Sequence, residues 1–230
     1  MPAALITGAS QGLGRALAGA LAGRGWDLVI DGRRAEPLAT AQSGFAGPGR
    51  VIALAGDVAD PSHRAELAGA VAELGRLDLL VNNASTLGPT PLPGLAKLDP
   101  ADLASVYRID VLAPLALIQL LLPQLTAAGG TVINLSSDAA LEHYPGWGGY
   151  GSAKAALDHL TGTLAAEQPA VRWYALDPGD MRTAMHQAAF PGEDISDRPL
   201  PESVVPALLE LLDSRPAGGR YRAADLLPIS

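Results

Sequence analysis

The sequence predicts a single α/β domain built on a doubly wound parallel sheet. Its 230 residues are enough for one well-buried core and fall in the usual range of one domain. Short runs rich in leucine and β-branched residues alternate with longer stretches rich in alanine and leucine. This alternation is typical of βαβ units, which form parallel sheets covered by helices. No repeat, linker or low-complexity segment interrupts the pattern, so we expect one domain over residues 1–230.

Each apolar run is assigned to an element by its length and position. Seven runs are short enough to be strands, at residues 3–7, 28–30, 51–54, 79–81, 131–135, 171–176 and 219–223. Helices are expected between them, at residues 13–24, 35–43, 62–74, 101–122, 150–167 and 203–212. The proline-rich stretches 88–93 and 191–201 are expected to be loops, and 181–201 is expected to cover a substrate site. Ligands of such sheets bind at the carboxyl ends of the strands, so the chemistry is expected there.

Charge and composition narrow the class of partner. The net charge of -8 and the pI near 4.9 argue against nucleic acid and anionic membrane surfaces, which attract basic proteins. The chain has no cysteine and therefore needs no oxidising compartment. Its first residues are typical of a strand rather than of a signal peptide, so the cytoplasm is the expected location. The longest apolar run, 111–122, is too short to cross a bilayer and is expected to be a buried or subunit-interface helix. The four histidines lack ligand-like spacing, so no metal is expected.

A glycine cluster follows the first predicted strand and opens the first predicted helix. Glycines at these positions let the backbone turn tightly and approach a pyrophosphate, which the helix N-terminus then binds through its N–H groups and dipole. A simple tight turn is the alternative. The residues expected to contact the nucleotide here are Gly8, Ser10, Gln11, Gly12, Leu13 and Gly14.

The end of the second strand carries residues of both signs, in the region that usually meets the adenosine ribose. An acidic side chain such as Asp31 would bond the 2′-hydroxyl of NAD(H), whereas Arg33 and Arg34 would attract the 2′-phosphate of NADP(H). We favour NADP(H) over NAD(H) because the paired arginines stand at the strand tip; solvated loop arginines are the alternative. Asp57, with Val58 beside it, is expected to bond the adenine or to cap the next turn.

Tyr150 and Lys154 are four residues apart in a chain with only two lysines. At this spacing on a helix the two side chains project from one face. A cation beside a phenol lowers the pKa of the phenol and prepares it for proton transfer at neutral pH. The pair therefore predicts an acid–base site.

Taken together, these motifs resemble the classical short-chain dehydrogenase/reductase family over nearly the whole chain. The matching motifs, each at a strand end and in the family's order, are Thr7 to Gly14, Asn82 to Ala84, Ser137, Tyr150 with Lys154, and Pro178-Gly179 with Thr183. The resemblance implies a Rossmann-type fold. It also implies an oxidoreductase that transfers a hydride between a nicotinamide cofactor and a carbonyl compound or a secondary alcohol.

The same resemblance implies a role for each matching residue. Tyr150 would exchange a proton with the substrate oxygen, and Ser137 would bond that oxygen, with Ser136 as the rival serine. Lys154 would hold the nicotinamide ribose and lower the pKa of Tyr150. The expected supports of the cofactor are Asn83 on the neighbouring strand and Pro178, Gly179 and Thr183 at the nicotinamide.

Two residues depart from the family pattern. Ser85 replaces a usual glycine, and Asp110 replaces a usual asparagine whose backbone holds a water in a proton relay. We count Asp110 among the candidate catalytic residues. If its side chain is ionised near Lys154, it raises the pKa of Tyr150, and reduced or acid-shifted activity is expected.

Aromatic and apolar residues flank the predicted acid. Tyr144, Trp147 and Met185 are expected to line a substrate pocket with His186 and Phe190, although they would also serve simply to pack the loop. A lone histidine such as His186 is more often a surface residue than a catalyst.

The expected substrate is a small or medium, largely apolar carbonyl compound or alcohol. The alternatives are a nucleotide-binding sensor or scaffold with little turnover and a dehydratase or epimerase of related fold. The resemblance also implies a homodimer or homotetramer.

Overall fold

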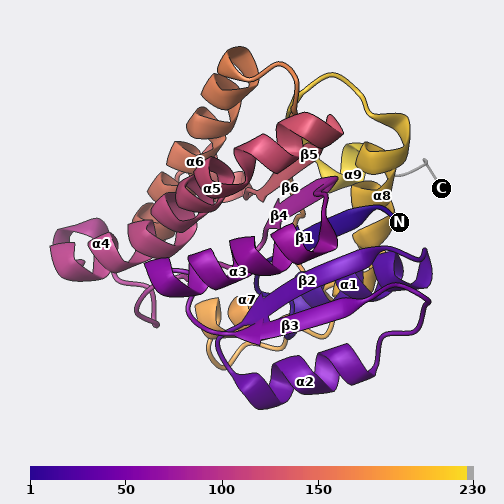
Figure 1. The fold of residues 1–230 in the computed structure, drawn as a ribbon. Helices are drawn as coiled ribbons and strands as arrows, with labels where there is room; N and C mark the ends of the chain where they lie inside the picture. The colour runs from indigo at the N-terminus through magenta and orange to yellow at the C-terminus, as the bar shows by residue number, and fades with distance from the viewer. Residues whose placement is uncertain (227–230) are drawn as a thin grey trace.

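The computed structural model of the chain describes residues 1–226, so the last four positions of the predicted domain lie outside the described residues. One seven-stranded parallel sheet with the strand order β3-β2-β1-β4-β5-β6-β7 forms the centre of the domain (Figure 1). The strands are β1 Ala3–Ile6, β2 Asp27–Gly32, β3 Val51–Ala55, β4 Leu79–Asn82, β5 Thr131–Leu135, β6 Arg172–Asp177 and β7 Gly219–Arg222. The predicted fold class, a doubly wound Rossmann-type domain, is confirmed.

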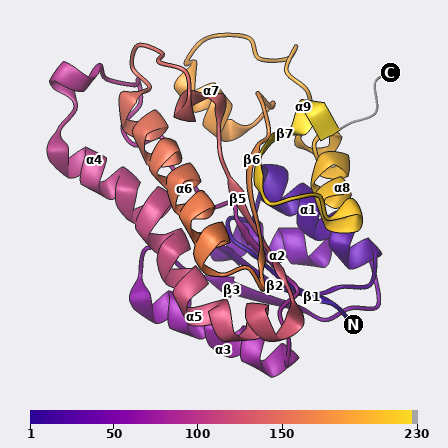
Figure 2. The same cartoon turned by 90° about the horizontal axis from the view of Figure 1, so that it is seen from above.

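Helices cover both faces of the sheet (Figure 2). They are α1 Gly12–Gly23, α2 Ala35–Ser43, α3 Pro61–Leu74, α4 Pro100–Tyr107, α5 Ala113–Ala128, α6 Gly148–Glu167, α7 Ala184–Ala189, α8 Val205–Ser214 and α9 Ala223–Leu226. Apolar residues of α1, α2 and α8 pack on one face, and those of α3, α5 and α6 pack on the other. Because both faces are covered, the inner strands β1, β4 and β5 are buried at every position rather than at alternate ones.

Local signals in the sequence explain where several helices begin and end. Asp60 caps α3 by accepting a hydrogen bond from the Ser62 N–H, and Pro61 occupies the first turn. The helix ends at Gly75, whose φ of 79° is the left-handed conformation that glycine adopts easily. Asp99 and Pro100 begin α4 in the same way.

The helix predicted at 101–122 is longer and less regular than expected. A π-helical turn, Arg108–Leu112, joins α4 to α5, and α5 continues past Pro123 to Gly129, where φ is 57°. The expected end at residue 122 is therefore wrong, because the loss of one backbone hydrogen bond at Pro123 does not stop the helix. The combined stretch Pro100–Ala128 is long and apolar enough for a membrane span by length and composition, whereas the run 111–122 was judged too short. Leu117, Leu121 and Leu125 bury one side of it against the sheet.

The strand order reverses at the centre of the sheet. β1 lies between β2 and β4, so the chain crosses from one half of the sheet to the other at this point. The chain after β1 leads to α1 on one face of the sheet, and the chain after β4 leads to α5 on the other face. Ligands of such sheets bind at this point.

Candidate functional site

A cavity of about 760 Å³ opens at the carboxyl ends of the strands, where the predicted site was expected. The predicted residues that line it are Gly8, Ser10, Gln11, Gly12, Leu13, Arg33, Asp57, Val58, Asn83, Ser137, Trp147, Tyr150, Lys154, Pro178, Gly179, Thr183 and Met185. Four predicted residues do not line it, and one of them is Phe190, which packs against Trp147. Gly14 lies behind the glycine loop, Asp110 is buried below the cavity with 1 % of its surface exposed, and Tyr144 is 45 % exposed outside it.

The glycine loop forms a cradle that side chains would fill. A Cβ atom on Gly8, whose φ is 67°, would lie 2.9 Å from the Ala84 Cα, and one on Gly14 would lie 2.5 Å from the Asn83 Nδ2. The Asn83 amide donates to the carbonyl oxygens of Thr7 at 2.8 Å and Gly8 at 3.1 Å, which fixes the loop. The start of α1 has neither an acidic residue nor a side-chain cap. Its free N–H groups therefore fit a pyrophosphate, as the family cofactor requires.

Both oxygens of the Asp31 carboxylate have partners within the protein. Its carboxylate is 2 % exposed, accepts a hydrogen bond from the Gly8 N–H, and lies 3.3 Å from the His63 Nε2. The bond to Asp31 raises the pKa of His63, against the effect of burial. Asp31 thus supports the glycine loop, and it lines the cavity together with Gly32, Arg33 and Arg34.

Asp57 caps the following turn, as one of its two expected roles requires, and it also lines the cavity. Its Oδ1 accepts a hydrogen bond from the Ala59 N–H at 2.9 Å, as in a turn, and the residue also lines the cavity with Val58. Arg15, in the first turn of α1, lines the same end of the cavity. Arg15 was not predicted as a cofactor-binding residue, although its position directly after Gly14 indicates that it lies near the glycine loop.

Tyr150 and Lys154 lie together on the buried face of α6. The Lys154 Nζ donates to the Leu135 carbonyl oxygen at 2.8 Å and lies 5.5 Å from the centre of the Tyr150 ring. The pKa of Tyr150 is raised, first by burial and next by the charge of Asp110, while the Ser137 hydroxyl lowers it. The expected lowering of the Tyr150 pKa by Lys154 is therefore wrong for this environment. The ammonium lies over the ring and bonds to a carbonyl, and Asp110 offsets its charge.

The two residues that depart from the family pattern contact each other. The Ser85 hydroxyl donates to the Asp110 Oδ2 at 3.0 Å, and the Thr86 N–H donates to the Oδ1 at 2.9 Å. Burial raises the pKa of Asp110, while Lys154 and these two donors lower it. A donor on each oxygen favours the ionised carboxylate, but burial is the larger effect and the pKa of Asp110 is raised overall. The π-helical turn at 108–112 positions this carboxylate beneath the site.

Ser136 and Ser137 point to different partners. The Ser136 hydroxyl donates to the Asp158 Oδ2 at 2.7 Å, beneath α6. The Ser137 hydroxyl donates to the Asp138 Oδ1 at 3.0 Å and is close enough to Tyr150 to lower its pKa. The arrangement places Ser137, rather than Ser136, beside the tyrosine.

A cluster of apolar and aromatic side chains lies beside Tyr150. Trp147 is packed edge-on against Tyr150 with ring centres 5.8 Å apart, and Phe190 lies 5.9 Å from Trp147. Leu87 and Met185 belong to the same cluster, and Leu87 was not predicted because it lies in no recognisable motif. His186 lines the cavity, as expected, and packs 4.9 Å from Phe190. With 9 % of its surface exposed it is not a surface residue. The short helix α7, which was predicted as part of a loop, buries it.

Known proteins share both the sequence pattern and this architecture. The family model described as short chain dehydrogenase matches residues 2–194. Sepiapterin reductase from Rattus norvegicus is 36% identical over 203 residues, which cover 80% of this chain and 76% of that protein. The solved structure of a short chain dehydrogenase from Pseudomonas syringae has a TM-score of 0.90 and 34% identity, covering 96% of this chain and 94% of that one.

A further solved structure is described with a bound cofactor. The alcohol dehydrogenase from the archaeon Thermococcus sibiricus, complexed with 5-hydroxy-NADP, has a TM-score of 0.87 and 26% identity. The alignment covers 100% of both chains. The likeness therefore extends over the glycine loop, the tyrosine helix and the last strands alike.

Proposed function

Since this chain belongs to the short-chain dehydrogenase/reductase family and is an NAD(P)-dependent oxidoreductase for a small molecule, we propose that it reduces a carbonyl compound with NADPH. In the reverse direction it would oxidise the corresponding secondary alcohol. One observation carries the proposal: Tyr150, Ser137 and Lys154 meet at one end of a cavity whose other end is the glycine cradle. The bound nicotinamide cofactor supplies or accepts the hydride.

Tyr150 is proposed as the proton donor to the substrate oxygen. Hydride addition to a carbonyl builds negative charge on oxygen, which hydroxyl donors stabilise in a site with little water. The Ser137 hydroxyl, beside the tyrosine, is placed to bond the same oxygen. The raised pKa of Tyr150 keeps its phenol protonated near neutral pH, which suits an acid and therefore the reductive direction.

NADP(H) is proposed as the preferred cofactor because of what occupies the end of β2. Asp31 is committed to Gly8 and His63, and Gly32 has no side chain with which to bond a ribose hydroxyl. Arg33, Arg34 and Arg15 supply positive charge along the adjacent wall of the cavity. Guanidinium groups favour a 2′-phosphate.

Fluorescence titration with NADPH and NADH tests this preference. We expect NADPH to bind at least about tenfold more tightly, and we expect Arg33→Ala to remove most of the difference, because a charge-assisted hydrogen bond contributes about 1.5–3 kcal/mol. Arg50→Ala is the matched control, since Arg50 is exposed at the opposite end of the sheet, before β3. Equal affinity of the natural protein for both cofactors would contradict the preference.

The proposed substrate is a small or medium, largely apolar carbonyl compound. Leu87, Trp147 and Met185 make the wall beside Tyr150 apolar and partly aromatic, and Phe190 packs behind Trp147. The relative from Rattus norvegicus is named as a reductase of sepiapterin, so aromatic ketones belong in the first panel of substrates. A panel of aliphatic and aromatic ketones and aldehydes, with the preferred cofactor, would test the reaction itself.

Asp110→Asn is expected to move the pH profile. The carboxylate raises the pKa of Tyr150, so its removal lowers that pKa, and the alkaline limb of kcat for reduction moves to lower pH by about one unit. The sequence analysis expected acid-shifted activity. The expected direction is now the opposite, because Asp110 moves the alkaline limb of kcat in the natural protein to higher pH. kcat measured from about pH 6 to pH 11 checks the shift. Asp102→Asn, on the exposed side of α4, is the control, and identical limbs in the natural protein and Asp110→Asn would overturn the interpretation.

A homodimer or homotetramer is also proposed. Leu112 and Leu120 are about half exposed, at 54 % and 46 %, on the side of the long helix that faces away from the sheet. Covering them would bury apolar surface. Light scattering of the purified protein gives the oligomeric state directly.

A further inference from the structure

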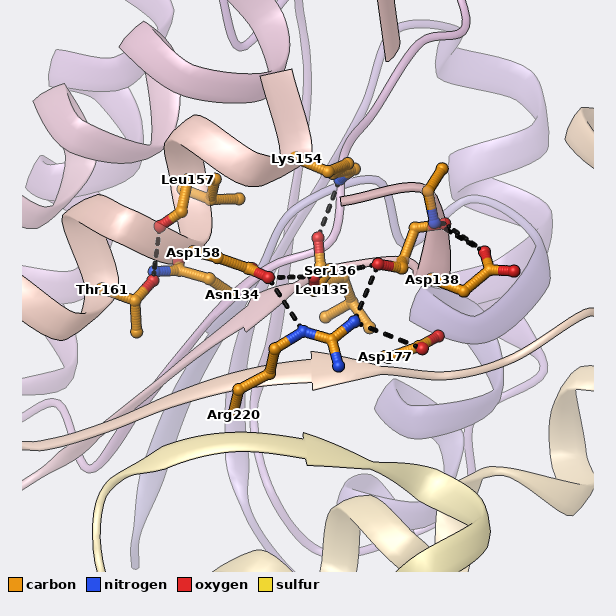
Figure 3. A network of polar contacts seen from close by, with 12 residues as sticks. Asn134, Leu135, Ser136, Asp138, Lys154, Leu157, Asp158, Thr161, Asp177 and Arg220 are labelled. Carbon is orange, nitrogen blue, oxygen red and sulfur yellow. Dashed lines mark hydrogen bonds and ion pairs between the residues drawn. The ribbon is translucent and has the colours of Figure 1, made fainter. Parts of the chain in front are cut away.

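One arginine outside the cavity connects the three segments that carry the proposed site. Arg220 lies on β7, the last strand of the sheet, and its guanidinium contacts three partners (Figure 3). The Nε donates to the Asp158 Oδ2 at 3.0 Å. The Nη2 donates to the Ser137 carbonyl oxygen at 2.8 Å and lies 3.4 Å from the Asp177 Oδ2.

The register of the sheet explains how an edge-strand residue reaches so far. Ala175 is the partner of Arg220 on β6, and Asn134 is the next partner on β5. Residues in register on parallel strands present their side chains on the same face. The small methyl group of Ala175 leaves space for the arginine stem, which crosses β6 beneath α6 to the end of β5.

Each partner of the guanidinium belongs to a different part of the proposed site. Asp158 lies one helical turn after Lys154 on α6, so it fixes the helix that carries the acid. The Ser137 carbonyl belongs to the residue proposed to bond the substrate oxygen. Asp177 accepts a hydrogen bond from the Gly179 N–H at 3.0 Å, so it holds the turn predicted to contact the nicotinamide.

Charge complements this geometry. Asp158 and Asp177 are both shielded from solvent, and burial raises the pKa of Asp158 while Ser136 and Arg220 lower it. A guanidinium is a planar fork of donors that can serve several acceptors at once. A lysine would place one compact charge there and would not span the three acceptors.

We propose that Arg220 is a positioning residue for hydride transfer: its guanidinium sets the Ser137 loop and the Pro178-Gly179 turn in place relative to the helix that carries Tyr150. The proposal rests on the proposed function, because it assigns Ser137 and Tyr150 to one substrate oxygen. Arg220 does not itself touch the substrate or the cofactor, since it does not line the cavity.

Three variants test the proposal in the full-length protein. Arg220→Lys keeps the charge and removes the fork, Arg220→Met removes both, and Arg222→Met changes the exposed arginine two residues further along β7. In both Arg220 variants we expect kcat to fall about 10- to 100-fold, because small displacements of reacting groups cost this much. The Kd for NADPH should change by no more than about threefold, since the glycine cradle and the proposed ribose arginines are untouched.

A double variant separates positioning from general stability. Arg220 acts on kcat through Ser137, so the loss in Ser137→Ala combined with Arg220→Lys should be clearly smaller than the product of the two single losses. A purely structural role would give independent losses that multiply. The proposal is overturned if the losses multiply, if Arg220→Lys has the kcat of the natural protein, or if Arg222→Met loses as much. Should Arg220→Met fail to fold, Arg220→Lys carries the test.

Hydrogen exchange distinguishes this proposal from the proposed function. Faster exchange of the amides at 137–140 and at 179–180 in Arg220→Lys is expected whether or not a substrate is known. If the natural protein reduces no carbonyl compound, the proposed function is wrong. If it is active while exchange and kcat stay unchanged in Arg220→Lys, the positioning role is wrong and the proposed function stands.

Discussion

Tyr150→Phe is expected to lower kcat for carbonyl reduction by about 10²- to 10⁴-fold, the usual contribution of a general acid. Phenylalanine keeps the ring that packs against Trp147 and removes only the hydroxyl, so the fold and the cavity are expected to remain. Binding of NADPH, followed by fluorescence, should change little because the glycine cradle is unaffected. Steady-state kinetics and titration on the same preparation therefore separate chemistry from binding.

Tyr107→Phe is the matched control for this change. Tyr107 lies at the end of α4 and does not line the cavity, so its variant should keep the activity of the natural protein. If Tyr150→Phe turned over at a comparable rate, Tyr150 would not be the acid. If the natural protein bound cofactor but reduced nothing in a broad carbonyl panel, the nucleotide-binding sensor or scaffold would become the better interpretation.

Lys154→Met should have the second largest effect and should act on stability as well as on catalysis. The change removes the hydrogen bond to the Leu135 carbonyl and leaves the buried Asp110 carboxylate without its cation. The lost hydrogen bond has a charged donor, and bonds of this kind contribute about 1.5–3 kcal/mol to the unfolding free energy. We expect kcat to fall by about 100-fold or more, because a fixed cation near the developing oxyanion is lost.

The chain offers a clean control, since Lys97 is its only other lysine and is exposed. Lys97→Met should leave both kcat and the midpoint of urea unfolding unchanged. The Lys154→Arg variant tests whether a positive charge alone is enough for activity. We expect its kcat to stay below that of the natural protein because the guanidinium is larger and planar. Full activity in Lys154→Met, measured with saturating NADPH, would show that Lys154 has no role in catalysis.

The fold was predictable because its signals are local. Each strand is a short apolar run, and helices such as α3 begin at an aspartate–proline pair and end at a left-handed glycine. The glycine loop, Tyr150 and Lys154 were found for the same reason, since each motif is short and lies at the end of a strand or on one helix. Tertiary packing decided only the boundaries, as where α5 continues through Pro123.

The features that were missed depend on contacts between distant parts of the chain. Asp31 lies next to arginines in sequence but points to Gly8 and His63, so its acidity says nothing about the ribose. Arg220 contacts a carbonyl 83 positions away, which no periodicity could indicate. The pKa of Tyr150 was predicted with the wrong sign because burial, which depends on the whole fold, has a larger effect than its neighbour Lys154.

The close packing at the end of β2 limits how this enzyme could be redesigned. A Cβ atom on Gly32 would lie 2.9 Å from the Cβ of Ser10 in the glycine loop. An engineer who wanted an enzyme that runs on NADH would place an acidic residue at position 32, but that single change would push the phosphate-binding loop out of position. Ser10 would have to be replaced by glycine at the same time, so a change of cofactor here has to be made in pairs of residues.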